Sequence, residues 1–537
     1  MHIGHFKNLQ PSFRPAYVDF TEHDVPAGFV SMKSIHKLQG NRGEFFLSSH
    51  ATYLQISRPL HSAHDLVFCF RKGRWWLSDD YSTLADMFEE LLVDPDFIAA
   101  YLSSSEEATD KTPFIGIQGI MPGTVVRLDK DGGYCVLVTS EGEDAPFGDK
   151  DIPHSLIKYI DQYNTGHRRF LIELSGGLDS TGLLYTSLEA TKDPASVLCV
   201  TYVDPYVKNG RDVKAAEGLC QRNNVEHITL PVHPEGMISK ALTAYTQKPP
   251  RPSPWLLFTA LQISLREHIN SLHGEIAVLN GHGGDHIFLA CPTTSAVLDY
   301  LLQRPPHPGR ALEVAKTLGV LRQFSWFGMA RQCLDESYKL LSAKFGALPA
   351  SARFSDPNRS ILTDECLRKS AAGRARIAQL LQCGSKEHPV NRRRRQAMNA
   401  VHHGSIDRIT DSNCPTLYPY LNRTLLSWAL HRPDSATFST QFNRLPQRRS
   451  FYERYGDDVF FSQGKGHLNG LVQRMFREES DEVTHLIMNG EAARHGFVNP
   501  EGLFCDMERC RLGGIPPTPA TFLVASLELY YKIWRRV

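Results

Sequence analysis

A glycine-rich turn after an apolar segment carries the most definite chemistry in the sequence. Residues 171–184 read LIELSGGLDSTGLL, so an apolar stretch ends in hydroxyl and glycine residues before a helical pattern begins. Gly176 and Gly177 lack a Cβ, and backbone amides there can approach a phosphate closely. Ser175 and Ser180 can donate hydroxyl hydrogen bonds, and the helix adds the positive end of its dipole. The turn predicts a loop that holds the pyrophosphate of ATP; a glycine turn with an aspartate cap is the structural alternative.

A second turn repeats this pattern at residues 278–288, VLNGHGGDHIF. Gly281 and Gly283 permit close approach to a nucleotide. Asp179 in the first turn and Asp285 in the second carry the same charge as a phosphate, so they fit beside one only if Mg²⁺ lies between them. We therefore expect both carboxylates to bind one metal–triphosphate. A tight turn capped by aspartate is again the alternative, and no Walker A motif is present.

The elements around the two turns predict how they meet. Apolar segments that indicate strands alternate with helical patterns at 211–223 and 255–270, and this alternation is typical of a doubly wound parallel sheet. Ligands in such sheets bind beyond the carboxyl ends of the strands. The expected strands are 168–174, 197–203, 226–231 and 275–280.

The remaining parts of the chain have a different character. The first 150 residues are rich in short β-strand patterns, and the sequence beyond about residue 295 is mainly helical. We expect a protein of α/β and α+β class with two domains, 1–150 and 151–537. The acidic, turn-rich segment 139–153 is interpreted as the linker between them.

The overall composition excludes several classes. With 537 residues and a net charge of +1, nothing global indicates a nucleic-acid or membrane-surface partner. No apolar segment reaches the roughly 20 residues of a membrane span, and the N-terminus lacks the apolar core of a signal peptide. The 11 cysteines show no C-x-x-C pair, so we expect reduced thiols and a cytoplasmic location.

Two basic features have plain interpretations. NRRRR at 391–395 predicts a solvated face, with contact to phosphates or an acidic peptide as the alternative. His402 and His403 lack further ligands at metal spacing and are interpreted as structural.

The two turns resemble those of the asparagine synthetase family, in which S-G-G-L-D-S is the pyrophosphate loop. The segment SNCPTLYPYLNRTLLSWALHRP (412–433) is similar to a stretch of that family, and FFSQGKGHLNGL (460–471) lies where the family carries a catalytic lysine, here Lys465. The resemblance implies an N-terminal glutaminase-like (Ntn-type) sandwich and a C-terminal ATP-pyrophosphatase-type synthetase domain with a helical extension. Val200, on an expected strand, is included among the cofactor-binding residues.

The sequence departs from the family at two positions. A glutaminase of this type uses a cysteine directly after the initiator methionine; here position 2 is His2, and the nearest cysteine is Cys69. We therefore expect no glutamine hydrolysis and no ammonia supply. His282 stands where the family carries a glutamate and its β-lactam branch a tyrosine. It is interpreted as a general base or, alternatively, as an exposed turn residue.

The ATP machinery without a glutaminase indicates a ligase whose amine comes from the substrate. The sequence looks most like the lasso-peptide macrolactam synthetases, which join a peptide N-terminal amine to an Asp or Glu side chain through an acyl-AMP. This resemblance implies a precursor-peptide substrate and a leader-peptide protease as a partner, with ATP and Mg²⁺ as cofactors. The alternatives are a β-lactam-forming synthetase, a glutamine-independent asparagine synthetase-like enzyme and a non-catalytic scaffold.

Overall fold

The structure is a computed structural model of the chain. It describes residues 16–18, 30–31, 46–50, 52–62, 65–78, 81–103, 110–138, 148–166, 168–207, 210–233, 235–245, 248–301, 305–345, 360–382, 397–401, 414–462, 469–513 and 515–536.

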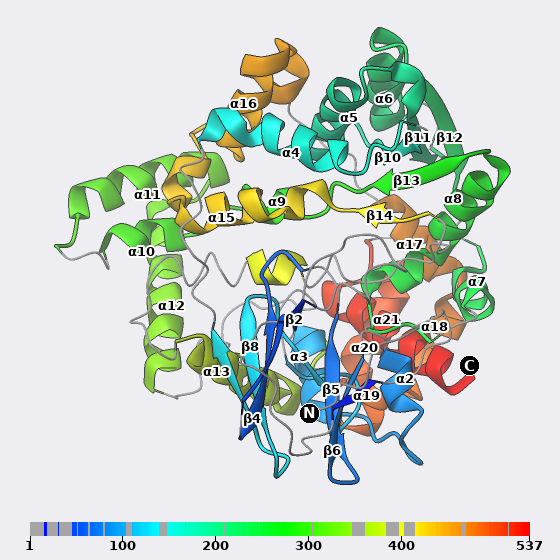
Figure 1. Ribbon diagram of the computed structural model, residues 1–537, viewed down its shortest axis with the longest axis vertical. Helices are drawn as coiled ribbons and strands as arrows, with labels where there is room; N and C mark the ends of the chain where they lie inside the picture. The colour runs from blue at the N-terminus through cyan, green and yellow to red at the C-terminus, as the bar shows by residue number, and fades with distance from the viewer. Residues whose placement is uncertain are drawn as a thin grey trace.

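A five-stranded parallel sheet lies in the upper half of the molecule (Figure 1). Neighbouring strands are hydrogen-bonded in parallel throughout. The predicted parallel sheet is confirmed, and the predicted strand ends differ from the observed ones by at most one residue. A two-residue fifth strand, β14, was not predicted. In spatial order the strands are β12 (Glu226–Pro231), β11 (Val197–Val203), β10 (Arg168–Glu173), β13 (Glu275–Leu279) and β14 (Thr416–Leu417).

Alternate residues of the central strands pack into two different cores. Phe170 and Ile172 belong to one cluster of buried side chains, whereas Leu171 between them belongs to another. Both faces of the sheet are therefore covered, which explains why these strands read as continuous apolar runs. One face packs against α4 (Ile152–Asp161), α5 (Leu178–Thr191), α6 (Arg211–Arg222) and α15 (Arg423–His431), and the other against α8 (Thr259–Ser271).

The N-terminal part contains two antiparallel sheets. Leu54 from one sheet and Phe68 and Trp75 from the other belong to the same buried cluster, so the sheets share a core as in a sandwich. The β-rich character of this part is confirmed, and its identity as a glutaminase-like domain stays a prediction. One sheet comprises β1 (Ala16–Val18), β6 (Arg74–Ser78), β5 (Val67–Arg71) and β7 (Gln118–Gly119); the other comprises β2 (Val30–Ser31), β3 (Phe46–Ser49), β4 (Tyr53–Arg58), β8 (Thr124–Asp129) and β9 (Tyr134–Val138).

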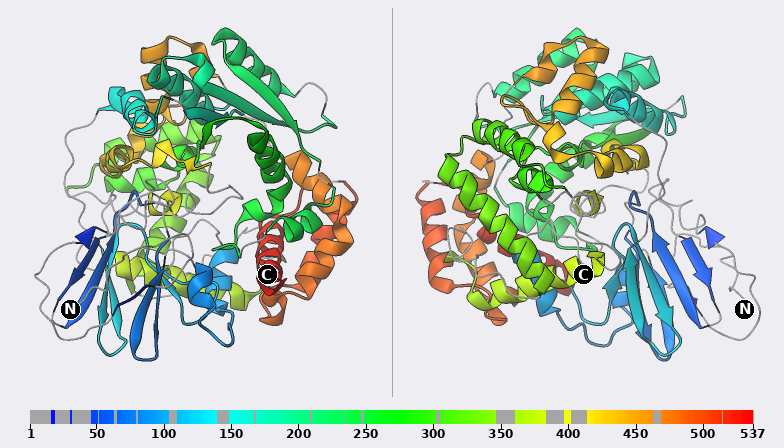
Figure 2. Two further views of the ribbon diagram at one scale, coloured as in Figure 1. Left: turned by 45° about the vertical axis from the view of Figure 1, so that its right-hand side comes forward. Right: turned by 90° about the vertical axis from the view of Figure 1, so that its left-hand side faces the viewer.

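Helices join the two sheet systems on both sides (Figure 2). The helical extension expected beyond residue 295 is present. On one side are α10 (Ser295–Leu301), α11 (Pro308–Arg322), α12 (Trp326–Phe345) and α13 (Asp364–Gln382). On the other are α7 (Met237–Ala244), α17 (Asn469–Glu478), α18 (Ser480–Met488), α19 (Glu491–Arg494), α20 (Pro500–Arg511) and α21 (Pro519–Arg536).

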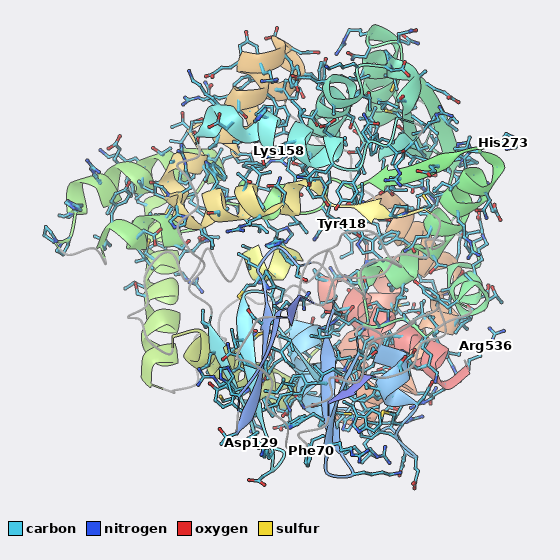
Figure 3. All side chains as sticks on the ribbon, viewed as in Figure 1. Phe70, Asp129, Lys158, His273, Tyr418 and Arg536 are labelled. Carbon is cyan, nitrogen blue, oxygen red and sulfur yellow. The ribbon has the colours of Figure 1, made fainter. Side chains whose placement is uncertain are left out.

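The C-terminal helix α21 packs against the N-terminal part. The Trp534 ring lies 5.4 Å from that of Tyr81 in α2 (Tyr81–Ala85) and 5.0 Å from that of Phe114. Tyr101 in α3 (Pro95–Ser103) forms a 2.7 Å hydrogen bond with Ser526 of the same C-terminal helix. The predicted boundary near residue 150 is thus crossed by shared cores. Figure 3 shows Tyr418, just after β14, between these two parts, and Phe70 and Asp129 at the outer end of the N-terminal sheets.

The structure bears on two expectations from the sequence, one about membrane spans and one about cysteines. Among the helices of the described ranges, none combines the length and apolarity that crossing a membrane requires. Ten cysteines lie within those ranges, and all ten are free thiols.

We predict that Glu528 makes stability fall at alkaline pH. Burial raises its pKa to about 8, although the amide of Ala492 and the charge of Arg494 act in the opposite direction. The folded protein therefore holds this proton more tightly than the unfolded chain, and the resulting stability, full below about pH 4.5, is lost as pH rises through about 8. Glu528→Gln should flatten this loss, which is at most a few kcal/mol at about 1.4 kcal/mol per pKa unit.

The measurement is urea unfolding at a series of pH values from about 5 to 9. Gln cannot accept from both the Glu491 and Ala492 amides, which each donate to Glu528 at 2.7 Å, so a constant loss of stability is expected as well. Substitution of Glu508, whose side chain is 35% exposed, by Gln is the control and should leave the alkaline slope unchanged. An unaltered slope in Glu528→Gln would contradict the assignment.

Candidate active site

The predicted phosphate loop forms a tight turn between β10 and α5. Gly176 has φ +67°, and a Cβ there would lie 3.0 Å from the Cβ of Ala215. The amide of Ser175 donates to Ser180 Oγ at 3.2 Å, and the amide of Gly177 donates to Ser175 Oγ at 3.4 Å. The Ser180 hydroxyl donates to the Gly177 carbonyl at 3.2 Å. Glycine is required at 176 by both conformation and space, and the loop opens at a helix N-terminus, where anions bind readily.

The second turn lies directly against the first. A Cβ at Gly281 would lie 3.2 Å from the Cβ of Asp179, and a Cβ at Gly284 would lie 2.3 Å from Asp179 Oδ1. Gly283 has φ +99°, and a Cβ there would lie 2.4 Å from Leu421. The glycines of this turn thus make room for the aspartate of the first loop and for the segment after β14. The two predicted motifs meet at one edge of the sheet, as expected for neighbouring parallel strands.

An arginine bridges the two carboxylates that were predicted to bind metal. Nη1 of Arg444, the residue before α16 (Leu445–Tyr455), donates to Asp179 Oδ2 at 2.8 Å and to Asp285 Oδ1 at 2.7 Å. Gln447 Nε2 donates to the other Asp179 oxygen at 2.8 Å. The Tyr420 hydroxyl donates to the Asp179 carbonyl at 2.9 Å. Asp179 is therefore fixed by three side chains from segments far away in the sequence.

The charges in this cluster differ in their access to solvent. The side chains of Arg444 and Asp179 are 10% and 14% exposed, whereas that of Asp285 is 45% exposed. Burial lowers the pKa of Arg444, but the charges of Asp179 and Asp285 outweigh burial and raise it overall. Burial and the charge of Arg444 lower the pKa of Arg448, one helical turn later, to about 10. Both guanidinium groups remain charged at neutral pH.

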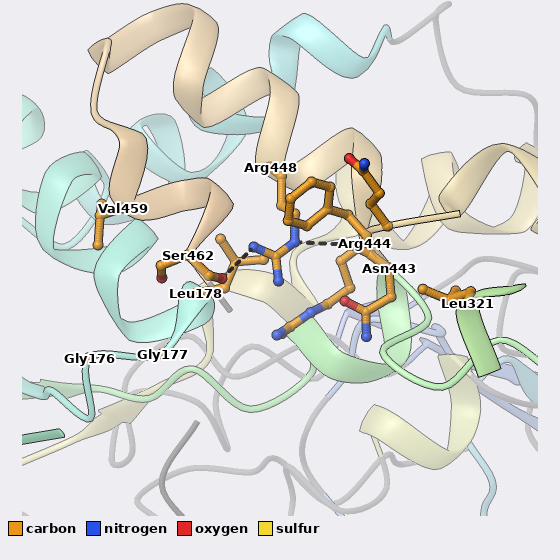
Figure 4. A pocket seen from close by; sticks show the side chains of 11 residues that line it. Gly176, Gly177, Leu178, Leu321, Asn443, Arg444, Arg448, Val459 and Ser462 are labelled. Atoms are coloured by element: carbon orange, nitrogen blue, oxygen red, sulfur yellow. Dashed lines mark hydrogen bonds between the residues drawn. The ribbon is translucent and has the colours of Figure 1, made fainter. Parts of the chain in front are cut away.

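A cavity of about 290 Å³ opens beside the phosphate loop, near the lower end of the range for ligand pockets. Arg444 and Arg448 project from the start of α16 toward the loop (Figure 4). Arg448 donates to the carbonyls of Phe460 and Ser462 at 2.6 and 3.2 Å, which fixes its side chain. The wall consists of Gly176, Gly177, Leu178, Leu321, Gln441, Phe442, Asn443, Arg444, Arg448, Val459 and Ser462.

His282 belongs to a hydrogen-bond network across three strand ends. The Tyr202 hydroxyl donates to Glu173 at 2.9 Å, and the Asn280 amide donates to the other Glu173 oxygen at 2.6 Å. The Asn280 side-chain oxygen accepts from the His282 amide at 2.8 Å. The His282 ring is bound through Nε2 to the carbonyl of Ala400 at 2.9 Å. Because a carbonyl only accepts, Nε2 carries the proton, and Nδ1 is the acceptor nitrogen of the neutral ring.

Other predicted site residues are placed differently. Val200 is fully buried in β11, and its carbonyl accepts from the amide of Leu174 at 2.8 Å. The structure thus gives its side chain a core position, and its contact with a nucleotide stays a prediction. Lys465, the stretch 391–395 and the pair His402 and His403 lie outside the described residues.

Sequence reasoning missed three residues that hold the site together: Tyr420, Arg444 and Gln447. The segment NRLPQRRS at 443–450 carries a signal, since its polar residues at 444, 447 and 448 have helical spacing and a proline near the start of the helix. That pattern also fits an ordinary exposed basic helix. Only the tertiary structure brings it to the two aspartates.

The donor set fits Mg²⁺ held together with phosphates. Within the described residues, no group of three or more His, Cys, Asp or Glu side chains could hold a metal ion. Two carboxylates that face a phosphate loop match the way Mg²⁺ usually binds, through one or two carboxylates plus substrate phosphates. Asp179 and Asp285 would supply these ligands if Arg444 released them.

The chain is similar to a known protein family and to a known protein. The model of the family described as asparagine synthase matches residues 165–504, which include both glycine turns and Arg444. An Escherichia coli protein described as "Microcin J25-processing protein McjC" is 20% identical over 466 residues, covering 86% of this chain and 80% of that protein.

Two solved structures overlap with part of the chain. An ammonia-dependent NAD synthetase from Campylobacter jejuni is 16% identical, with 45% of this chain and 99% of that chain covered and a TM-score of 0.22. A glutamine-dependent NAD⁺ synthetase from Acinetobacter baumannii is 15% identical, with 56% and 61% covered and a TM-score of 0.22. TM-scores this low add nothing to the assignment of the site.

We predict that Gly284→Ala displaces the Asp179 carboxylate without unfolding the protein. The new methyl group would lie 2.3 Å from Asp179 Oδ1, and the carboxylate is a movable group. We expect a loss of Mg·ATP affinity of about tenfold or more, about 1.4 kcal/mol per factor of ten, measured by calorimetry. Gly218→Ala in α6 is the matched control, because its Cβ meets nothing within 4 Å. Unchanged affinity in Gly284→Ala would show that Asp179 does not contribute to nucleotide binding.

Proposed function

Because the chain belongs to the asparagine synthase family, we propose that it uses ATP to close a macrolactam within a ribosomally made peptide. The family and the Escherichia coli relative make it an ATP-dependent carbon–nitrogen ligase. In the proposed reaction, an Asp or Glu carboxylate of the peptide attacks the α-phosphorus of ATP, and pyrophosphate leaves. The peptide N-terminal amine then attacks the acyl carbon of the adenylate, loses a proton and expels AMP. The observation that carries this proposal is an ATP-type site in a chain that lacks the nucleophile for making ammonia.

The first half-reaction would depend on the two glycine turns. Ser175, Gly176, Gly177 and Ser180, with the N-terminus of α5, would bind the phosphates, and Gly281 and Gly283 would allow the nucleotide to approach. Asp179 and Asp285 would hold Mg²⁺, which neutralises phosphate charge when bound. The cavity beside the loop supports this assignment, because two guanidinium groups line it.

The source of the amine follows from the N-terminal part. Position 2 is His2, which cannot form an acyl thioester. Cys69 in β5 is no substitute, since it is 1% exposed and burial raises the pKa of its thiol to about 11. A buried thiol that stays protonated at neutral pH is a poor nucleophile. We therefore propose that the substrate itself supplies the amine.

His282 is the proposed general base for that amine. The hydrogen bond from Nε2 to Ala400 fixes the ring and leaves Nδ1 as the acceptor nitrogen. The turn that carries His282 also carries Asp285, so the base lies in the same loop as a proposed metal ligand. Lys465 is proposed to stabilise negative charge in both steps.

A peptide substrate is supported by the relative described as processing microcin J25 and by exposed apolar side chains on α11, which reaches the cavity, and on α12. Leu321 at the end of α11 lines the cavity. On α11 and the following helix α12, the exposed fractions of Val320, Trp326, Phe327 and Leu334 are 62%, 59%, 80% and 71%. Apolar surface of this kind is typical of sites that bind another chain, and a small amino-carboxylate would not need it. We place the reaction in the cytoplasm and expect a leader-peptide protease to act on the same precursor.

Two alternatives share the site chemistry. A β-lactam-forming synthetase would adenylate a small amino-carboxylate, and a glutamine-independent asparagine synthetase-like enzyme would use free ammonia. Substrate-dependent ATP–pyrophosphate exchange separates them from the peptide proposal, and it also separates all three from a non-catalytic scaffold. A short precursor-peptide gene beside the gene for this chain favours the peptide.

We predict that the peptide encoded by that neighbouring gene, freed of its leader, supports exchange and loses one water in the presence of ATP and Mg²⁺. Replacement of its acceptor Asp or Glu by Asn or Gln should abolish both, because no carboxylate is left to adenylate. Acetylation of its N-terminus should preserve exchange and abolish ring closure, because only the second step needs the amine. Mass spectrometry and exchange of labelled pyrophosphate are the measurements.

The same preparation should release no glutamate from glutamine, with or without ATP. Exchange with a small amino-carboxylate and none with the peptide would overturn the macrolactam proposal in favour of the β-lactam alternative. Glutamate release above that of a blank without enzyme would contradict the prediction that the N-terminal part does not hydrolyse glutamine.

We predict that His282→Ala separates the two half-reactions. Exchange should continue, while ring closure slows by roughly 10²–10⁴, the usual effect of losing a general base. Raising the pH should restore part of the rate, because more of the amine is neutral. Asn280→Ala is the companion variant: it removes the acceptor for the His282 amide and should slow closure less. If exchange and closure fall equally in His282→Ala, the residue serves ATP binding or adenylation and is not the base.

A further inference from the structure

Arg444 occupies the place between Asp179 and Asp285 that a divalent cation would need. We propose that Arg444 is an internal counter-ion that keeps the metal site closed to free divalent cations, and that the site opens only when the phosphates of ATP bind Arg444. Mg²⁺ would then enter as its ATP complex. This inference rests on the Mg·ATP part of the proposed function and is independent of the peptide substrate.

The proposal rests first on the geometry with which Arg444 bridges Asp179 and Asp285. A single nitrogen, Nη1, contacts oxygens of both carboxylates at 2.8 and 2.7 Å. Mg²⁺ binds carboxylate oxygens at about 2.0–2.1 Å with nearly ideal octahedral geometry. A metal ion that joins Asp179 and Asp285 would therefore take the volume that Nη1 now fills. The guanidinium and the metal ion exclude each other at this point.

The proposal rests also on the charges of Arg444 and the two aspartates. Asp179 is 14% and Asp285 45% exposed, and two carboxylates that contact one nitrogen repel each other where water is partly excluded. Arg444 relieves this repulsion in the nucleotide-free protein, so the carboxylate pair can form before any metal binds. A free cation must displace a buried guanidinium without offering it a new partner, and this makes metal binding alone unfavourable.

An unsatisfied donor on Arg444 carries the third step. Its Nε is buried and finds no hydrogen-bond acceptor in the described part of the chain, and the side chain lines the cavity beside Gly176 and Gly177. A phosphate in that cavity would give Arg444 Nε the acceptor that it lacks, since guanidinium and phosphate pair well. The guanidinium could then leave the carboxylates to the metal at little cost.

The backbone supports a functional reason for this placement. Arg444 has φ +51° and ψ 37°, the left-handed region that non-glycine residues rarely adopt. This conformation aims the side chain from the start of α16 at the two aspartates, and the helix continues away from the site. Strained residues of this kind cluster at ligand sites.

The test measures metal binding in the absence of nucleotide, with Mn²⁺ as the probe and electron paramagnetic resonance as the readout. The wild-type chain should bind Mn²⁺ weakly and should bind it much more tightly with a non-hydrolysable ATP analogue. Arg444→Gln should tighten nucleotide-free Mn²⁺ binding by roughly 10- to 100-fold, the gain expected when a competent state of about 1–10% becomes dominant. Arg444→Lys keeps the charge and should remain close to wild type.

Two further variants test whether the effect arises because Arg444 fills the space between the two aspartates or only because it is positively charged. Arg448→Gln removes a neighbouring positive charge that binds backbone carbonyls, and it should change nucleotide-free Mn²⁺ affinity by less than about threefold. Asp285→Asn in the Arg444→Gln background should return binding to the wild-type level or below. Thermal unfolding monitors the fold of each variant.

The proposal is overturned if Arg444→Gln binds Mn²⁺ no more tightly than wild type, or if Arg448→Gln tightens binding equally. Should Arg444→Gln fail to fold, the wild-type comparison decides: Mn²⁺ affinity that is the same with and without the ATP analogue would overturn the proposal. None of these readouts uses the peptide, so a failed ring closure assay leaves them unaffected, and the reverse is also true.

Discussion

The site depends on the need to keep two carboxylates together at the carboxyl ends of neighbouring parallel strands. β10 and β13 are adjacent and in register, so the loops that follow them must meet, and each loop carries an aspartate. Like charges at this separation are costly where water is partly excluded. The chain meets the constraint with Arg444, which bridges the pair, while Gln447 fixes the side chain of Asp179 and Tyr420 fixes its backbone carbonyl. Segments more than 240 positions downstream in the sequence therefore complete the first loop.

The same constraint explains why glycine recurs in both turns. A side chain at 284 would collide with Asp179, one at 281 would be tightly packed against Asp179, and one at 283 would collide with Leu421. The glycines are therefore needed for the protein to pack against itself as much as for a phosphate to approach. Phosphate-loop chemistry and tight packing make the same demand on the sequence here, and the motif is informative because few other arrangements satisfy both.

Sequence reasoning recovered the elements whose signal is local. The strands of the parallel sheet and the two turns carry apolar runs and glycine pairs that identify them directly, and the structure confirms their meeting. β14 was not predicted, because two residues show no periodicity. Its pairing with β13 nevertheless fixes the segment that leads to Tyr420. The role of Arg444 was not predicted, because it depends on contacts with residues 265 and 159 positions away in the sequence. Val200, predicted to bind the nucleotide, has its side chain in the core, and its contact with a nucleotide stays a prediction; the local sequence does not reveal which layer covers each face of its strand.

Packing joins the N-terminal part of the chain to the rest of the structure. Tyr81 and Phe114 of the N-terminal part are buried in the same core as the C-terminal helix α21. Trp534 in α21 packs against Tyr81 and Phe114, and its indole nitrogen donates to the carbonyl of Pro249 at 2.8 Å. Removing the N-terminal part would therefore expose the apolar face of α21 to water, at about 25 cal/mol for each Å² uncovered. α21 in turn packs against α18 and α7, which belong to the synthetase half. The N-terminal part therefore contributes to the packing of the half of the chain that carries the candidate site.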